Sequence, residues 1–199
     1  MKKVQKETIR TFIAVELPRE IHDKLKQLQD DLKAFMPDVR WIKYENVHLT
    51  LKFLGDVQIS RIDAISEAVR DVARQFSPFT TSLTGIGAFP DSRKPRVVWV
   101  GLEKGGDKLI EIAELIEASM RKLGFPREKR KFSPHLTVGR VRRLTDPAAM
   151  TQALERSAVG ELGEFVVERV SLIRSQLDPA GSIYTILTEA PFSGLDAGY

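Results

Sequence analysis

The tripeptide His-Leu-Thr occurs twice in this chain of 199 residues, at 48–50 and again at 135–137. Each copy opens an apolar segment, "HLTLKFLG" and "HLTVGRV", with the composition of a buried strand. Side chains along a strand alternate between two faces, so the histidine and threonine of each copy share one face and the leucine points to the other. The repeat therefore predicts two similar strands, each with an imidazole and a hydroxyl opposite its core-facing side.

The spacing of the two copies, 87 residues, is close to half of the chain. A single strand histidine is more often a core or surface residue than a functional one, so either copy alone would indicate little. Two of the three histidines are followed by Leu-Thr, however, which favours a shared role. We therefore expect two pseudo-symmetric lobes, related by a rough two-fold axis, that each contribute one motif strand to a central cleft.

Segments of strand composition alternate with amphipathic helical segments along the rest of the chain. Several strands follow one another without an intervening helix, which favours antiparallel sheets in an α+β fold with the helices outside. No low-complexity linker divides the chain, so residues 1–199 are expected to form a single bilobal domain. The expected helices cover 19–35, 60–76, 106–124 and 147–157, and the expected strands cover 8–17, 39–44, 47–55, 79–89, 96–102, 135–141, 163–177 and 182–190.

Composition limits the chemistry that the chain can perform. It has no cysteine, which excludes disulfides, thiolate metal sites and cysteine nucleophiles and is compatible with a reducing cytoplasm. No histidine pair stands at a helical ligand spacing, so no metal site is expected. No apolar run has the length of a membrane helix, and the basic N-terminus has the pattern of a first strand rather than of a signal peptide. We therefore expect a cytoplasmic protein with no membrane partner.

Positive charge is concentrated in one segment. Residues 121–143 contain nine Lys and Arg and one Glu, whereas the whole chain has a net charge of only +4. Such a run is commonly a solvated loop. The second His-Leu-Thr lies inside it, however, which favours an anionic ligand.

Two histidines and two threonines around one cleft are suited to phosphoryl chemistry. With an unperturbed pKa of about 6.5, one neutral and one protonated imidazole can serve as base and acid near neutral pH. Threonine hydroxyls can donate hydrogen bonds to a developing oxyanion. In-line displacement at phosphorus needs such a set, with a base beside the incoming nucleophile, an acid beside the leaving oxygen and donors between them.

The sequence around both tripeptides resembles a known family. The contexts "VRWIKYENVHLTLKFLG" and "FSPHLTVGR", with the opening "RTFIAVELP", are similar to the two-histidine (2H) phosphoesterases. Within them, the chain resembles the bacterial and archaeal RNA 2′,3′-cyclic phosphodiesterases, also called 2′-5′ RNA ligases, over nearly its whole length. The resemblance implies a hydrolase without metal or organic cofactor that opens a 2′,3′-cyclic phosphate at an RNA end to a 2′-phosphate. A monomer is expected.

Roles for the four motif residues follow from the resemblance. It implies that His48 protonates the leaving 3′-oxygen, that His135 activates water, and that Thr50 and Thr137 hold non-bridging oxygens. The pseudo-symmetry leaves the two histidine roles interchangeable on sequence alone. RNA ligation through a 2′-5′ linkage would reverse the same reaction. A non-catalytic RNA-binding module is the alternative of a different class, and it is less favoured because binding has no need of an acid-base pair.

Candidate substrate contacts beside the motifs are Arg140, Lys52, Phe132 and Arg130. By strand alternation Lys52 falls on the histidine face, although an exposed strand lysine is equally compatible with the sequence. Arg140 falls on the opposite face, and it reaches the cleft only if the strand ends or bulges near Gly139.

Three further residues have weaker signals. Phe132 and Trp41 could stack on a base, as aromatic residues do in single-stranded RNA sites, although core packing is the more common role. Arg130 lies in the basic run and is a candidate for contact with the RNA backbone. His22 lies among charged residues of an expected helix, has no partner motif and is expected on the surface.

Overall fold

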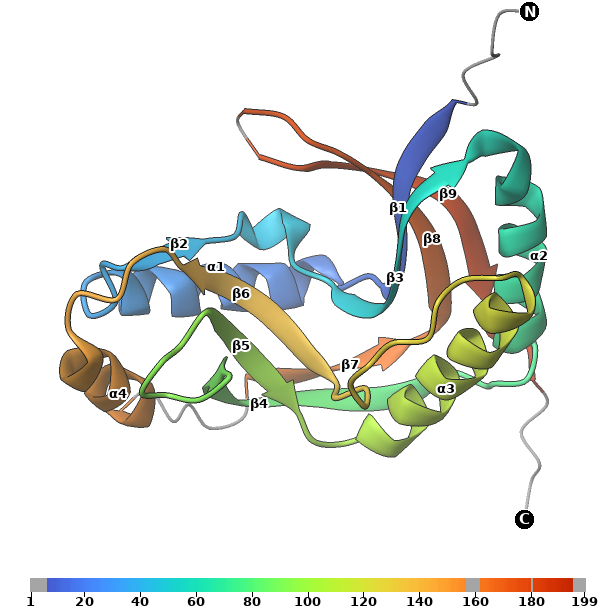
Figure 1. The fold of residues 1–199 in the computed structure, drawn as a ribbon. Helices are drawn as coiled ribbons and strands as arrows, with labels where there is room; N and C mark the ends of the chain where they lie inside the picture. The colour runs from blue at the N-terminus through green and yellow to red at the C-terminus, as the bar shows by residue number, and fades with distance from the viewer. Residues whose placement is uncertain (1–6, 157–161, 180, 195–199) are drawn as a thin grey trace, which may run out of the picture.

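The computed structural model describes residues 7–156, 162–179 and 181–194, which form two antiparallel sheets and four α-helices (Figure 1). The first sheet has the strand order β3-β1-β8-β9, and the second sheet has the order β2-β6-β5-β4-β7. This architecture confirms the α+β class expected from the sequence. The elements are β1 (Thr8–Val15), α1 (Arg19–Lys33), β2 (Val39–Trp41), β3 (Leu49–Gln58), α2 (Ile62–Ala73), β4 (Phe79–Phe89), β5 (Val97–Leu102), α3 (Gly106–Lys122), β6 (His135–Val141), α4 (Pro147–Arg156), β7 (Gly163–Val167), β8 (Arg169–Gln176) and β9 (Ile183–Pro191).

Every expected helix and strand has a counterpart in the described residues, with differences at the boundaries. The segment 163–177, expected as one strand, is divided at Glu168 into β7 and β8, which belong to different sheets. Strand β3 begins at Leu49, so His48 lies immediately before its strand, whereas His135 is the first residue of β6. Residue 157, expected as the end of the fourth helix, lies outside the described residues.

The two sheets are built alike. The order β3-β1-β8-β9 of the first sheet corresponds strand for strand to β6-β5-β4-β7 of the second, and β2 extends the second sheet beyond β6. Each sheet takes strands from both halves of the chain, because β8 completes the first sheet and β4 completes the second. The lobes therefore do not coincide with the two halves of the sequence.

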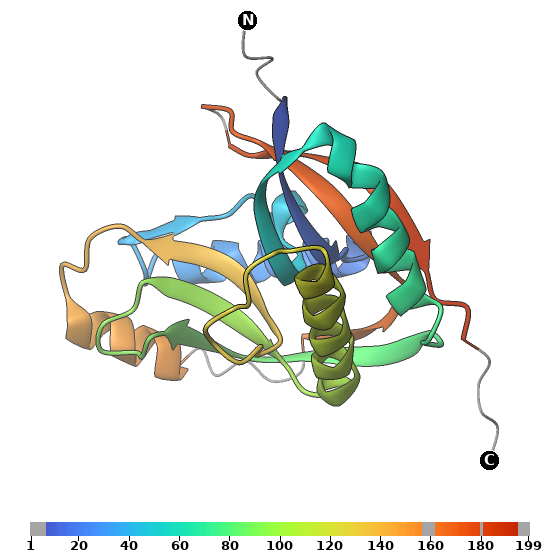
Figure 2. The same ribbon diagram turned by 45° about the vertical axis from the view of Figure 1, so that its right-hand side comes forward.

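Helices cover the outer faces of the sheets (Figure 2). Helix α2 packs on β8 and β9, α3 packs on α2 and β3, and α4 contacts β4. The helices are amphipathic, as α1 illustrates, where Ile21, Leu25, Leu28 and Leu32 recur at intervals of three or four residues and are all buried. None of the helices in the described part of the chain is long and apolar enough to cross a membrane.

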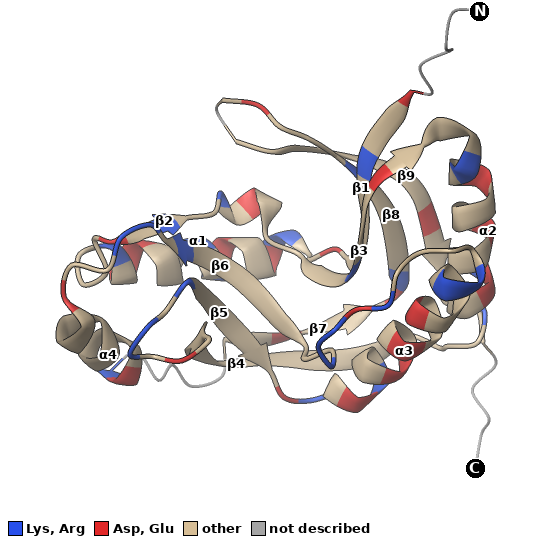
Figure 3. Ribbon diagram, in the orientation of Figure 1, with Lys and Arg blue, Asp and Glu red and all other residues tan. Residues whose placement is uncertain are grey.

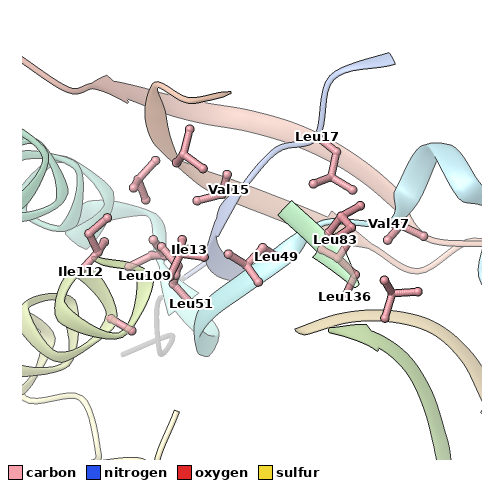
Figure 4. Close-up of a cluster of buried hydrophobic side chains, with 14 of the residues drawn as sticks. Ile13, Val15, Leu17, Val47, Leu49, Leu51, Leu83, Leu109, Ile112 and Leu136 are labelled. Carbon is pink, nitrogen blue, oxygen red and sulfur yellow. The ribbon is translucent and has the colours of Figure 1, made fainter. Parts of the chain in front are cut away.

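A large hydrophobic cluster packs between the sheets and helices (Figure 4). The central leucines of the two tripeptides, Leu49 and Leu136, have no exposed surface and both belong to this cluster. Burial of a leucine side chain stabilises a fold by about 1.5–3 kcal/mol relative to exposure. The core therefore anchors both motif strands, and strand alternation turns the histidine and threonine of each motif away from it.

A β-bulge follows the first tripeptide. The β1 partners of Thr50 and Lys52 are adjacent residues, so Leu51 is an extra residue in β3. The bulge reverses the alternation of faces beyond it. Lys52 turns to the core side, where only 3% of its surface is exposed and its Nζ lies 2.7 Å from Oε2 of Glu117 in α3. The expectation that Lys52 faces the cleft is therefore wrong, because it assumed unbroken alternation.

The second tripeptide is followed by the same irregularity. The β5 partners of Thr137 and Gly139 are adjacent residues, so Val138 is an extra residue in β6. Beyond this bulge Arg140 shares the face of Thr137, which meets the condition set out above for its access to the cleft. Gly139 faces the core side, where a Cβ atom would lie 2.4 Å from Val39 Cγ1. The close approach of β2 therefore requires a glycine at this position.

The buried ion pair of Lys52 and Glu117 gives a test of the bulge. Lys52→Met should lower the free energy of unfolding by about 3 kcal/mol, because it leaves a mostly buried carboxylate without its cation. The exposed pair of Lys104 and Glu164 is the matched control, and Lys104→Met should cost less than about 1 kcal/mol. Urea unfolding followed by circular dichroism measures both. Adding Glu117→Gln to Lys52→Met should restore part of the stability, and a further loss of similar size would contradict the ion-pair explanation.

Candidate active site

A cleft of about 630 Å³ is lined by residues of both sheets. Its lining includes His48, immediately before β3, and Thr50 of β3, together with Thr137 and Arg140 of β6. His135 is not among the residues that line this cleft, but it lies two residues before Thr137 in β6, and β3 and β6 come into contact although they belong to different sheets. A second hollow, of about 710 Å³ between α1 and α4, is lined by no histidine or threonine. The cleft is therefore the candidate active site.

The two motif imidazoles are held by the same backbone contact. His48 Nδ1 lies 2.9 Å from the carbonyl oxygen of Asn46, and His135 Nδ1 lies 2.7 Å from that of Ser133, in both cases two residues before the histidine. A carbonyl oxygen only accepts hydrogen bonds, so each Nδ1 carries the proton and donates it. In the neutral ring each Nε2 then has a free lone pair, which can accept a proton from a ligand.

The surroundings of the two imidazoles differ. The His48 ring stacks on Phe12, with ring centroids 4.5 Å apart, and meets the Tyr184 ring edge-on at 5.2 Å. The His135 ring meets Phe89 edge-on, with ring centroids 5.0 Å apart. Burial among aromatic rings penalises a charged imidazole and lowers the pKa of His48 to about 4, although the hydrogen bond to Asn46 acts in the opposite direction. His48 is therefore neutral at pH 7 in the unliganded protein.

Two contacts fix the backbone that carries His48. Nδ2 of Asn46 donates to the carbonyl oxygen of Ser182, immediately before β9, over 2.8 Å. Nε2 of His22 lies 3.1 Å from the carbonyl oxygen of Val47 and donates to it from α1. His22 is thus half-buried beside the motif rather than free on the surface as expected, because α1 lies closer to the motif than a sequence pattern can indicate.

The cleft has basic and apolar walls. Arg10, Arg40, Lys43 and Arg140 contribute basic side chains, and Phe53, Leu177 and Tyr184 contribute apolar surface. Figure 3 shows basic residues gathered where β2 and β6 lie together and along the loop between α3 and β6.

Two residues of the cleft were not predicted from the sequence. Phe53 was missed because the bulge at Leu51 brings its side chain to the cleft face. Tyr184 was missed because it lies in β9, far from both motifs in the sequence, and belongs to no recognisable pattern.

The remaining sequence candidates lie elsewhere or have mixed roles. Phe132 packs against the hydrophobic core and does not line the cleft. Arg130 is exposed in the loop before β6, outside the residues that line the cleft. Trp41 lines the cleft and also packs against the core. Among the described residues, no group of three or more His, Asp or Glu side chains is arranged to hold a metal ion.

Two lobes that each supply a His-x-Thr strand to one cleft define the class of two-histidine phosphoesterases. The model of the family described as LigT-like phosphoesterase matches residues 15–99 and again 100–184, with one histidine motif in each match. The chain belongs to this LigT-like phosphoesterase family. This result confirms the family that the two tripeptides indicated.

Curated relatives and solved structures agree with this assignment. A relative from Methanothermobacter thermautotrophicus named RNA 2′,3′-cyclic phosphodiesterase is 38% identical over 177 residues, which cover 89% of this chain and 95% of the relative. A relative of the same name from Archaeoglobus fulgidus is 37% identical over 176 residues, covering 88% and 96%. The structure of E. coli LigT complexed with 3′-AMP superimposes with a TM-score of 0.77 at 26% identity, covering 94% of this chain and 99% of that one.

The lowered pKa of His48 predicts a pH dependence of stability. Its pKa is about 4 in the folded protein and about 6.5 in an unfolded chain, so between these values the unfolded state binds more protons. The free energy of unfolding should therefore fall as the pH drops from about 6.5 to 4, by up to about 3 kcal/mol from this group. His48→Gln should lack this contribution. Denaturant titrations of both proteins across that range measure it, and a difference in stability independent of pH would contradict the burial argument.

Proposed function

We propose that this protein is an RNA 2′,3′-cyclic phosphodiesterase, a hydrolase that opens the cyclic phosphate at an RNA end to a 2′-phosphate. The observation that carries the proposal is the pair of His-x-Thr strands, with both imidazoles tied at Nδ1 and both strands meeting at one cleft. The shared name of the relatives at 37% and 38% identity supports the substrate class. The basic wall of the cleft suits a polyanionic substrate.

The reaction that fits the site is an in-line displacement. A water oxygen attacks phosphorus, the bond from phosphorus to the 3′-oxygen breaks, one imidazole takes the proton of the water and the other protonates the leaving oxygen. Thr50 and Thr137 donate hydrogen bonds to the non-bridging oxygens, where negative charge develops. In this proposal His135 is the base and His48 is the acid, as the family resemblance implies.

The acid role of His48 requires a change of protonation when substrate binds. In the unliganded protein its burial keeps the imidazole neutral at pH 7, with the proton on Nδ1 and none on Nε2. A phosphodiester anion beside Nε2 favours the charged imidazole and raises its pKa, which is the effect of an opposite charge within about 4–6 Å. Substrate binding and proton uptake by His48 are therefore coupled in this mechanism.

Arg140 and Arg130 have separate roles in the proposal. Arg140 lines the cleft on the same face as Thr137 and contacts the nucleotide. Arg130 lies in the loop before β6, which leads directly to His135, and contacts the backbone of longer RNA outside the cleft. Ligation through a 2′-5′ linkage, as the reverse of the hydrolysis, uses the same atoms. A binding module without catalysis is tested by the same assay as the hydrolase.

The position of the broken bond is the most direct test. With acid and base fixed on opposite sides of phosphorus, one orientation of the nucleotide expels one oxygen, so a single regioisomer should form. RNA ending in a 2′,3′-cyclic phosphate should be converted to RNA ending in a 2′-phosphate, as resolved by chromatography against both standards. A pure 3′-phosphate product would mean that the nucleotide lies the other way round, with its 2′-oxygen beside the acid. Binding without turnover would instead support the non-catalytic module.

Histidine variants test the acid-base pair. His48→Ala and His135→Ala should each lower kcat by about 10²- to 10⁴-fold, because each removes a proton-transfer group. His22→Gln is the matched control, because it keeps a donor for the carbonyl oxygen of Val47, and it should lower kcat far less.

The rate of hydrolysis should follow a bell-shaped pH profile and should persist in EDTA. Loss of activity in EDTA that a divalent ion restores would refute the metal-free mechanism.

A further inference from the structure

Two arginines lie directly opposite each other on one wall of the cleft. In the antiparallel pairing of β2 with β6, Arg40 is the register partner of Arg140. Residues in this relation point to the same face and have Cβ atoms about 4.5–5.5 Å apart. Both side chains are exposed and both line the cleft. The second sheet therefore presents two adjacent guanidinium groups to the same space.

The arginine pair is not neutralised within the described part of the chain. Like charges directly opposite each other on neighbouring strands destabilise a sheet. Neither Arg40 nor Arg140 makes an ion pair or a side-chain hydrogen bond among the described residues, and the cleft is also lined by Lys43 and by one carboxylate, Asp178. A pair of guanidinium groups in this arrangement is suited to bind a phosphate, with which each can form paired hydrogen bonds.

The arginine pair lies beyond the position proposed for the reacting phosphate. Arg140 is three residues after Thr137 along β6, at most about 10 Å at 3.3 Å per residue. Arg40 lies on the neighbouring strand β2, about 4.8 Å from β6. The pair is therefore displaced from the histidine–threonine set toward the edge of the second sheet, where β2 is the last strand.

The same cleft is also lined by exposed apolar side chains that come from the first sheet and its β8–β9 hairpin. Phe53 is 58% exposed and Leu177, at the end of the β8–β9 hairpin, is 78% exposed, and both line the cleft. A groove with cations on one side and exposed apolar or aromatic side chains on the other is typical of single-stranded nucleic-acid sites, where phosphates follow the cations and bases contact the apolar surface.

We propose that Arg40, together with Arg140, binds the internucleotide phosphate immediately upstream of the reacting nucleotide. This inference rests on the proposed function, because it places the RNA end in the cleft. It makes Arg40 a determinant of the preference for RNA over nucleosides. A nucleoside 2′,3′-cyclic phosphate has no upstream phosphate, whereas a dinucleotide ending in a cyclic phosphate has one. Arg40 should therefore increase kcat/KM for the dinucleotide but not for the nucleoside cyclic phosphate.

The test compares Arg40→Gln with the wild type on these two substrates. Wild-type kcat/KM should be higher for the dinucleotide, and Arg40→Gln should reduce that preference by about tenfold or more, as expected for loss of a hydrogen bond to a charged group. The slope of log kcat/KM against log salt for the dinucleotide should become shallower by about 0.7, which corresponds to one phosphate on a single strand. Arg70→Gln, in α2 on the outer face of the first sheet, removes the same charge and should alter neither quantity.

The outcomes separate this proposal from the proposed function. If Arg40→Gln lowers kcat/KM equally on both substrates, or leaves the preference unchanged, the upstream phosphate is not bound by Arg40. If the wild type hydrolyses neither substrate, the proposed function fails, and calorimetric binding of a dinucleotide ending in a 2′-phosphate then decides the role of Arg40. Binding weakened about tenfold by Arg40→Gln supports the proposal, and unchanged binding refutes it. Circular dichroism of the variant verifies that it is folded.

Discussion

The β-bulge that follows each His-Leu-Thr is the constraint on which the rest of the site depends. With strict alternation, Lys52 and Gly139 would face the cleft, and Phe53 and Arg140 would face the core. The extra residue in each strand reverses this order. The buried cation is then matched by Glu117, and the glycine allows β2 to approach β6. The two bulges therefore determine both the composition of the cleft and the packing behind it.

The same hydrogen bond to the backbone holds the motif histidine in both lobes, but the side chains around the two histidines are different. Each imidazole donates Nδ1–H to the carbonyl oxygen two residues before it. His48 is enclosed by Phe12 and Tyr184, which lowers its pKa to about 4, whereas His135 has Phe89 at its edge. A lowered pKa alone suits a base, so the acid role proposed for His48 depends on the phosphate anion of the substrate, which would raise that pKa. The pseudo-symmetry thus holds the two imidazoles in the same way, and the aromatic rings around them differ.

Local patterns predicted the elements of this fold better than their arrangement. The helices, the strands and the core positions of Leu49 and Leu136 follow from periodicity and from the repeated motif. The bulge at Leu51 has no sequence signal, because leucine is an ordinary strand residue. The second bulge has one, because the adjacent Gly139 indicates a possible irregularity in the strand. The division of 163–177 between two sheets depends on tertiary pairing. The contacts of His22 and Ser182 with the first motif also depend on tertiary structure, because they join residues far apart in the chain.

The exchange of strands between the sheets joins them closely at one point. Strand β7 belongs to the second sheet and β8 to the first, and Glu168 alone separates them. One residue spans at most about 3.6 Å, so the sheets cannot separate at this point without loss of strand pairing. The N–H of Phe192 also donates to the carbonyl oxygen of Glu168 over 2.8 Å. The displacement mechanism proposed above needs two imidazoles on opposite sides of one phosphorus atom, and misplacement by about 1 Å can be costly. The crossing of the chain at Glu168 supports that proposal because it joins the sheets that carry the two motifs.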